Sequence, residues 1–340
     1  MSFEQQIKQK ALDLGFDAVG ITTAEPVAAA HIEYFRQWLS RGNAGEMAYM
    51  HRNTEKRFDP ARLLAGAKSV ICVALNYRLN KDQQADNPGI RIARFAQYID
   101  YHPFIKDRLF QLAEFIQTQT KARQRELPDC DVEHVGNIDK GLRFKACVDS
   151  VPIAERALAQ RAGLGFIGRN HMLIHPELGN QILLGELITT LELEPDEPME
   201  NLSCGDCGRC IRACPTGALG FDGTFDARKC ISYLTIEAPV SKNSPPAKGE
   251  YPEGGRGLNY IFGCDECILA CPHETGKPER KNKDFQHHPE WQNLTLDQIQ
   301  AMTEADFQKT FANSGFIRLG MERLKRNVAD LSRRSPEAKG

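Results

Sequence analysis

Two short cysteine-rich runs constrain this chain more than any other feature. The first, CGDCGRCIRACP, has the spacing C-x2-C-x2-C-x3-C-P, and the second, CDECILACP, repeats C-x2-C-x3-C-P. The proline after each run stops a helix and fixes the local backbone. With one isolated cysteine between the runs, the eight residues are Cys204, Cys207, Cys210, Cys214, Cys230, Cys264, Cys267 and Cys271. They provide two sets of four thiolates, the ligand count of two 4Fe–4S clusters.

Structural zinc is the alternative for these cysteines, but zinc sites usually pair two CxxC units around a longer gap. In two-cluster ferredoxins the fourth cysteine of a run ligates the other cluster. One predicted cluster site is therefore Cys204, Cys207, Cys210 and Cys271, and the other is Cys214, Cys230, Cys264 and Cys267. Cys230 stands far ahead of Cys264, so the total of eight ligands is better founded than their division between the clusters.

The composition excludes several classes of protein. The chain has 340 residues, enough for two or three domains, with 41% hydrophobic and 26% charged residues. No apolar run approaches the roughly 18 residues of a membrane span, and the N-terminus MSFEQQIKQKALDLGF lacks a signal-peptide core. Eleven cysteines without an export signal indicate a reducing compartment, so we expect a cytoplasmic protein. A formal charge of −2 excludes bulk attraction to nucleic acid but leaves local basic patches.

The residue pattern predicts an alternation of helices and strands ahead of the cysteines. We expect helices over 5–14, 29–42, 103–126 and 152–162, strands over 16–24, 69–77 and 144–150, and a hairpin over 172–193. This alternation is typical of an α/β domain with helices layered on a sheet. The prediction is three parts: an α/β domain over 1–194, a ferredoxin-like domain over 195–280 with a loop at 241–257, and a short helical C-terminal segment over 281–340.

Several familiar sites are missing from the sequence. There is no P-loop, and GLGFIG (163–168) does not open a helix directly after a strand, so a Rossmann domain is not supported. The histidines lack HExxH spacing, and we expect His287 and His288 to be a solvated pair. Cys72 and Cys147 sit in apolar strand patterns and are predicted to be buried core residues. Cys130 is uninformative.

Asp149 is an acidic residue with two possible roles, a helix N-cap and a proton donor. It ends a predicted strand just ahead of a predicted helix, so it is a candidate N-cap that satisfies free backbone N–H groups. Ser150 can cap equally well, and that leaves Asp149 free to face a pocket as a proton donor. The local sequence leaves both interpretations open.

Taken together, these segments resemble the epoxyqueuosine reductase family. The resemblance rests on VDSVPIAERALAQRAGLGFIGRN, the two cysteine runs, RKCISYLT, EKRFDPARLLAGAKSV, IDYH and GFIRLGMERLKRNV, and it covers nearly the whole chain in order. Some family members carry a C-terminal helical-repeat extension, and we do not expect one in this protein.

The resemblance implies an oxidoreductase that reduces epoxyqueuosine to queuosine at the wobble position of tRNA, with a cobalamin and two 4Fe–4S clusters as cofactors. It makes the N-terminal domain the cobalamin-binding part, fed with electrons by the clusters. The proton donor of the family maps onto Asp149. A donor that works near neutral pH needs a raised pKa, and we expect burial beside the corrin to raise it.

The resemblance also implies, less directly, the residues that contact cobalamin. They are Arg57, Asn170, His171, Leu173, Ser232, Thr235 and Asp265. No DxHxxG motif for histidine ligation of cobalt occurs, so a base-off or weakly ligated cobalt is the hypothesis.

The implied partners are tRNA carrying epoxyqueuosine in its anticodon loop and an external low-potential electron donor, with no membrane. We expect a monomer. Candidate phosphate contacts lie in the basic segments 276–283 and 318–327. Two alternatives remain: a reductive dehalogenase-like corrinoid enzyme acting on a small molecule, and a ferredoxin-type electron-transfer protein.

Overall fold

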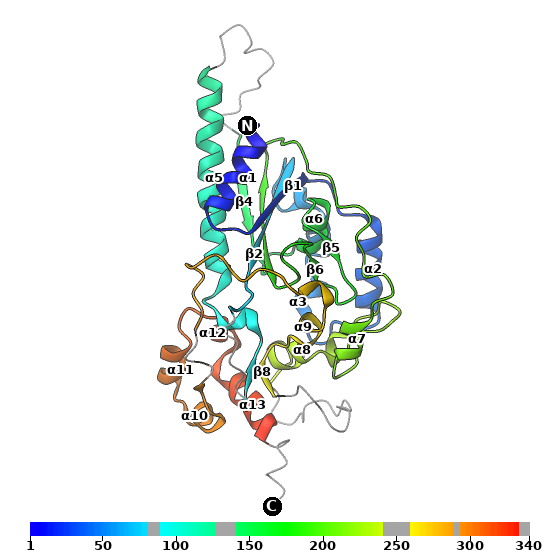
Figure 1. Ribbon diagram of the computed structural model, residues 1–340, viewed down its shortest axis with the longest axis vertical. Coiled ribbons are helices and arrows are strands. Elements are labelled where there is room, and N and C mark those ends of the chain that lie inside the picture. The colour runs from blue at the N-terminus through cyan, green and yellow to red at the C-terminus, as the bar shows by residue number, and fades with distance from the viewer. Residues whose placement is uncertain (81–88, 127–140, 241–258, 289–290, 292, 333–340) are drawn as a thin grey trace, which may run out of the picture.

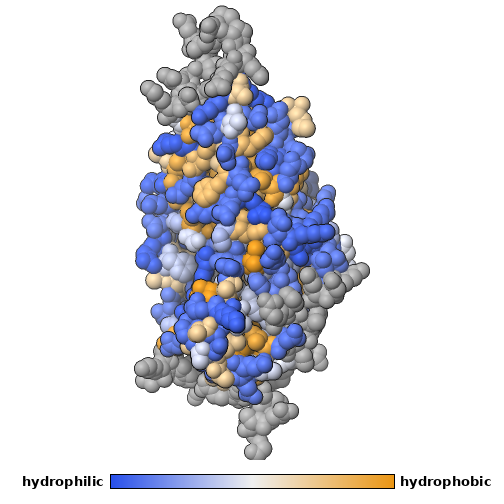
Figure 2. Space-filling model, turned by 90° about the vertical axis from the view of Figure 1, so that its left-hand side faces the viewer, coloured by the Kyte–Doolittle hydropathy of each residue, from blue (hydrophilic) through white to orange (hydrophobic). Residues whose placement is uncertain are grey.

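The structure is a computed structural model that describes residues 1–80, 89–126, 141–240, 259–288, 291 and 293–332 (Figure 1). Cys130 and the predicted loop 241–257 lie outside the described residues. In the part of the chain described, no helix is long and apolar enough to cross a membrane. The side of the molecule that α5 (Tyr101–Glu126) covers is largely hydrophilic, with hydrophobic residues scattered between (Figure 2).

A four-stranded antiparallel sheet forms the centre of the N-terminal part. Its strand order is β1-β2-β7-β4, with the strands β1 (Ala18–Thr23), β2 (Ser69–Asn76), β7 (Ile182–Thr189) and β4 (Phe144–Cys147). Every residue of β2 is buried, because helices cover both faces of the sheet (Figure 1). The predicted layered α/β architecture is confirmed.

Each face of the sheet has its own core. On one face α1 (Phe3–Asp13) and α5 pack over residues such as Ile71 and Leu187. On the other face lies α6 (Glu155–Arg161), which packs on β2 and β7. Gly20 of β1 allows this close packing, because a Cβ there would lie 2.0 Å from the carbonyl oxygen of Ala162.

The predicted hairpin over 172–193 is wrong in its pairing. β6 (Leu173–Ile174) pairs instead with β5 (Phe166–Ile167), and β7 crosses into the central sheet between β2 and β4. Only a single bridge, from His175 to Gly179, joins the two flanks of the expected turn. The apolar run of β7 needs partners on both edges, and the sheet provides them.

The other helices of the chain are mostly short. Near the N-terminus these are α2 (Ala29–Ser40), α3 (Ala48–His51) and α4 (Thr54–Phe58). The cysteine segment contains α7 (Arg209–Ala213), α8 (Ile231–Ile236) and α9 (Glu266–Leu269). The C-terminal segment contains α10 (Leu296–Ala301), α11 (Glu304–Thr310), α12 (Phe316–Leu319) and α13 (Met321–Ser332).

The C-terminal segment packs against a parallel pair of short strands, β3 (Arg91–Ile92) and β8 (Tyr260–Phe262). An aromatic core that includes Trp291 holds it there. His288 stacks on Trp291 at 4.4 Å between ring centroids, and His287 packs edge-on against Tyr98. The expectation of a solvated His287–His288 pair is therefore wrong. The predicted domain boundaries after residues 194 and 280 stay predictions.

Candidate functional site

Asp149 lies in the loop between β4 and α6, with a left-handed backbone φ of 46°. The N-cap of α6 is Ala154, and no side chain caps this helix. The N-cap interpretation of Asp149 is therefore wrong. Its side chain is 60% exposed, and its Oδ2 lies 3.1 Å from Nε2 of His102.

His102 is the centre of a chain of polar contacts that ends at Asp149. Its Nδ1 lies 2.6 Å from Oδ1 of Asp100, and Nε of Arg318 donates to Oδ2 of the same carboxylate at 3.1 Å. The Tyr101 ring stacks on the imidazole, 4.1 Å between centroids. The backbone N–H of Asp100 donates to the carbonyl of Asn313 at 2.6 Å, so the C-terminal segment holds this loop in place. We call Asp100, His102 and Asp149 the proton relay.

The relay determines where a proton is held. Burial acts to raise the pKa of Asp149, but hydrogen bonds from His102 and Tyr101 outweigh it, and the pKa lies below its usual value. Burial acts to lower the pKa of His102, but the carboxylates of Asp100 and Asp149 outweigh it, and this pKa is raised. The protein groups around Asp149 therefore lower its pKa, and the rise expected from burial beside a corrin stays a prediction. The proton of the pair is held on His102.

Asp149 belongs to a cluster of polar and aromatic side chains that we call the polar cleft. Oε1 of Glu155 accepts from the backbone N–H of Asp149 at 2.7 Å, Arg156 donates to the carbonyl of His171, and His171 stacks with Tyr34. Electrostatic effects connect Tyr49 and Arg57 to Asp149. The members of the cluster are Tyr34, Tyr49, Arg57, Asp149, Glu155, Arg156 and His171.

Two side chains in this cleft have polar atoms without partners among the described residues. They are the buried Nε of Arg57 and Nε2 of His171. His171 has φ of 60° and lies between the rings of Tyr34 and Phe225, at centroid distances of 5.6 and 5.7 Å. Burial and the neighbouring Arg156 lower the pKa of His171 to about 4, so the imidazole is neutral. Buried unpaired groups of this kind fit a bound molecule with hydrogen-bonding groups along its edge.

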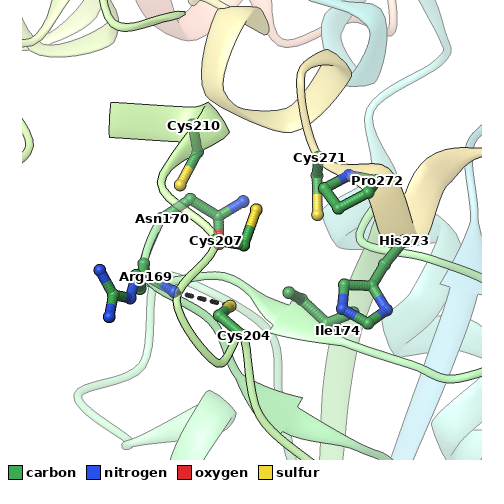
Figure 3. Close-up of a pocket in the computed structure, with 9 residues that line it drawn as sticks. All are labelled: Arg169, Asn170, Ile174, Cys204, Cys207, Cys210, Cys271, Pro272 and His273. Atoms are coloured by element: carbon green, nitrogen blue, oxygen red, sulfur yellow. Dashed lines mark hydrogen bonds between the residues drawn. The ribbon is translucent and has the colours of Figure 1, made fainter. Parts of the chain in front are cut away.

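One set of cysteine thiols surrounds a cavity with about 290 Å³ of empty volume, part of it open to solvent (Figure 3). The sulfur atoms come from Cys204, Cys207, Cys210 and Cys271. The backbone N–H of Arg169 donates to Sγ of Cys204 at 3.4 Å. The structure thus brings together the four residues of the first predicted cluster site, which we call the first cage.

The other four cysteines form the second cage: Cys214, Cys230, Cys264 and Cys267. Burial raises the pKa of the Cys267 thiol well above its usual value, and neighbouring Cys264, Cys230 and Cys214 raise it further. Thiols this close cannot all ionise unless a cation compensates their charge. The donor set therefore fits an iron–sulfur cluster, whose iron atoms supply that charge.

The first cage surrounds an open volume between its four cysteine side chains (Figure 3).

Asn170 links the cages to the cleft. Its side chain lines the first cage, and its Nδ2 donates to the carbonyl of Cys267 in the second cage at 3.4 Å. The next residue, His171, lines the polar cleft. The turn between β5 and β6 therefore touches all three sites.

The other predicted cofactor contacts, Leu173, Ser232, Thr235 and Asp265, interact with other parts of the protein. Leu173 is buried in the core beneath α6, and the hydroxyl of Thr235 accepts from the N–H of Gly263 at 2.9 Å. Burial raises the pKa of the Cys230 thiol, and the neighbouring Tyr233 and Ser232 act against that rise. Asp265 is buried, its Oδ2 accepts from the N–H of Arg94 at 2.7 Å, and burial raises its pKa to about 6.

Some basic side chains of the segments 276–283 and 318–327 donate hydrogen bonds to carbonyl groups within the protein. Arg326 donates to the carbonyls of Leu234 and Ala238, and Lys325 donates to the carbonyl of Met302 at 2.6 Å. In the segment 276–283, Lys277 donates to the carbonyl of Pro176. Lys281 and Lys283 are exposed.

Sequence reasoning missed much of the cleft. His102 and Tyr101 belong to the segment IDYH, which contributed only to the family resemblance, and Glu155 and Arg156 belong to a predicted helix. Glu186 was missed as well. A glutamate inside the apolar strand ILLGELIT is an unusual residue choice, and that signal was available.

Comparisons with known proteins agree over nearly the whole chain. A family model described as "Epoxyqueuosine reductase QueG, DUF1730" matches residues 57–150, and one for a "4Fe-4S double cluster binding domain" matches residues 203–274. The epoxyqueuosine reductase of Gloeobacter violaceus is 38% identical, over 95% of this chain and 93% of the relative. That of Escherichia coli K12 is 36% identical, over 96% of this chain and 79% of the relative.

Solved structures of epoxyqueuosine reductases also match this chain. Epoxyqueuosine reductase from Streptococcus thermophilus matches with a TM-score of 0.78 and 30% identity, over 97% of this chain and 81% of that one. An epoxyqueuosine reductase bound to an epoxyqueuosine-modified tRNA-Tyr stem loop matches with a TM-score of 0.77 and 30% identity, over 96% and 80%. The enzyme from Bacillus subtilis, described with a catalytic aspartate loop swung out of its active site, matches with a TM-score of 0.76 and 29% identity, over 96% and 80%.

Proposed function

The chain belongs to the epoxyqueuosine reductase family, and on that premise we propose that it reduces epoxyqueuosine in tRNA to queuosine. The observation that carries the proposal for this chain is the carboxyl group of Asp149. This carboxyl group does not cap a helix, it contacts His102, and it belongs to the polar cleft beside the two cysteine cages. The catalytic aspartate loop described for the Bacillus subtilis relative supports giving Asp149 the role of proton donor.

The reaction sets the requirements for the site. Both C–O bonds of the epoxide break, a C=C bond forms, and the oxygen leaves as water, which takes two electrons and two protons. The cysteines of the two cages would hold two 4Fe–4S clusters, which would supply the electrons one at a time. Cobalamin supplies the low-potential cobalt chemistry that delivers them to an organic substrate.

The polar cleft is the proposed cobalamin site. The rim of the corrin carries amide groups, and the nucleotide tail carries a phosphate. The unpartnered Nε of Arg57 and Nε2 of His171 match such groups, and Tyr34 and Phe225 offer flat apolar faces beside His171. Asn170 contacts both cages, and the next residue, His171, belongs to the cleft.

Asp149 and His102 act as one proton-donating unit in this proposal. His102 holds the proton in the ligand-free chain, and Asp149 is the member exposed to the cleft. Passing a proton from His102 through Asp149 to the departing oxygen neutralises the charge that develops there. Asp100 keeps the imidazole oriented, as the third member of a triad does.

The tRNA approaches the cleft from outside, with its wobble base turned out of the anticodon stack. Exposed Lys281 and Lys283 are the phosphate contacts that we propose in the first basic segment. Arg318 is half-exposed beside Asp100 and is the proposed contact in the second. Binding through a few phosphates falls with rising salt concentration. We propose a monomer that takes its electrons from an external low-potential donor.

The test is turnover. The protein is reconstituted anaerobically with iron, sulfide and cobalamin, given a chemical reductant and epoxyqueuosine-containing tRNA, and the nucleosides are measured by mass spectrometry. Queuosine formation that requires both cofactors supports the proposal. A protein that binds clusters but no corrin is an electron carrier instead, and one that binds both but leaves the tRNA unchanged has another substrate.

A further inference from the structure

Glu186 has no role in the account so far, although its position is unusual. It lies in the middle of β7 with no solvent exposure, opposite Cys72 of β2 and Cys147 of β4. Neither carboxyl oxygen has a hydrogen-bond partner among the described residues. A buried polar group without a partner costs roughly 1–3 kcal/mol, so packing alone does not explain a glutamate here.

Glu155 connects Glu186 to the proton relay. It lies at the start of α6, which packs on β7, and its Oε1 accepts the backbone N–H of Asp149 at 2.7 Å. Glu155 is partly exposed at the cleft, whereas Glu186 lies within electrostatic reach of both Glu155 and Asp149 in the interior. The three carboxyl groups thus run from the interior of the sheet to the cleft.

The surroundings determine how many protons these groups hold. Burial raises the pKa of Glu186 well above its usual value, and the charges of Glu155 and Asp149 raise it further. Burial and Asp149 raise the pKa of Glu155 to about 7, against the opposing effect of Arg156. The thiols that flank Glu186, Cys72 and Cys147, have raised pKa values because they are buried, and are neutral. Near neutral pH the interior acid therefore carries a proton, and the acid at the cleft has a raised pKa.

The proposed reaction uses two protons in each turnover, and the pair of His102 and Asp149 holds one. We propose that Glu155 and Glu186 form a carboxyl pair that stores the second proton and returns it to Asp149. The inference rests on the proposed function.

The transfer balances without a further reactant. After His102 has given up its proton through Asp149, Glu155 returns one to this pair through a water molecule in the cleft. This leaves Glu155 ionised and the pair of His102 and Asp149 protonated again, with the proton on His102. Glu186 then protonates Glu155, and the pair regains a proton from solvent at the cleft, where Glu155 is accessible.

The first test needs no turnover. Infrared spectra of the cofactor-loaded protein in H₂O and D₂O identify protonated carboxyl groups by their C=O stretching band, which shifts on deuteration. At neutral pH we expect such a band in the wild-type protein, its loss in Glu186→Gln, and its retention in Glu192→Gln. Glu192 is a fully exposed control whose pKa is lowered by Lys68. A spectrum that Glu186→Gln leaves unchanged would overturn the inference.

The second test uses turnover and separates storage from structure. We expect Glu186→Gln to turn over about tenfold more slowly, less than the roughly 10²–10⁴-fold effect of a direct general acid, with a larger solvent deuterium isotope effect because reprotonation becomes limiting. Glu155→Gln, at the partly exposed position, gives the same result if Glu186→Gln does not fold. If the wild-type enzyme is active and both variants show the wild-type rate and the wild-type isotope effect, the proposal that Glu155 and Glu186 store a proton is refuted. An inactive wild-type enzyme refutes only the proposed function, and the infrared band still decides on the carboxyl pair.

Discussion

Replacing His102 with glutamine removes the group that holds a proton beside Asp149. His102 Nε2 lies 3.1 Å from the Asp149 carboxylate and Nδ1 lies 2.6 Å from the Asp100 carboxylate. A hydrogen bond with a charged partner contributes about 1.5–3 kcal/mol, and about 1.4 kcal/mol corresponds to a factor of ten in rate. We therefore predict that His102→Gln lowers the rate of epoxide reduction roughly 10- to 100-fold.

The assay is a single turnover of epoxyqueuosine-containing tRNA by excess cofactor-loaded enzyme, stopped at intervals and followed by nucleoside mass spectrometry. In the wild-type enzyme the rate falls as pH rises through the raised pKa of His102, because the relay then loses its proton. His102→Gln should lack this decline.

A double variant provides the control. Because His102 acts through Asp149, adding His102→Gln to Asp149→Asn should slow the reaction no further. A His102→Gln enzyme with the wild-type rate and the wild-type pH profile would refute the relay.

Three further predictions concern stability and cofactor content. Glu274 forms a buried ion pair with Arg78. Glu274→Leu should therefore lower the free energy of unfolding by about 3–5 kcal/mol in denaturant titrations, because it leaves Arg78 buried without a partner. Replacing both residues with leucine should lower it by less, and equal losses would contradict a buried ion pair. Cys230→Ala should lose roughly half of the bound iron in a metal assay, whereas full iron would exclude Cys230 as a ligand. The pKa of Glu155 is raised from 4.5 to about 7. The contribution of Glu155 to stability is therefore present at low pH and is lost as pH rises through about 7, by up to about 3 kcal/mol. Glu155→Gln should flatten the dependence of the free energy of unfolding on pH, and an unchanged curve would contradict the raised pKa.

Features with a local physical cause could be predicted from the sequence. The ligand spacing of the cysteines is set by short turns, so the residues of each cage could be proposed before the structure. β2 was predicted because the seven consecutive apolar or small residues from Ser69 to Leu75 favour a strand that is buried on both faces.

Features that depend on contacts far apart in the chain could not be predicted. β7 looked like half of a hairpin with β6, but its partners β2 and β4 come from distant segments. The relay joins residues 47 positions apart, and only the fold brings His102 to Asp149. That contact also lowers the pKa of Asp149, an effect that no feature of the sequence indicated.

The central claim is that Asp149 donates the proton that releases the epoxide oxygen, and one measurement tests it most directly. Asp149→Asn enzyme with the wild-type content of iron and cobalamin is incubated with reductant and epoxyqueuosine-containing tRNA, and queuosine is measured by mass spectrometry. We predict that the variant binds the tRNA and both cofactors but forms queuosine at least roughly 10²-fold more slowly than the wild-type enzyme. Queuosine formation at the wild-type rate would contradict the claim.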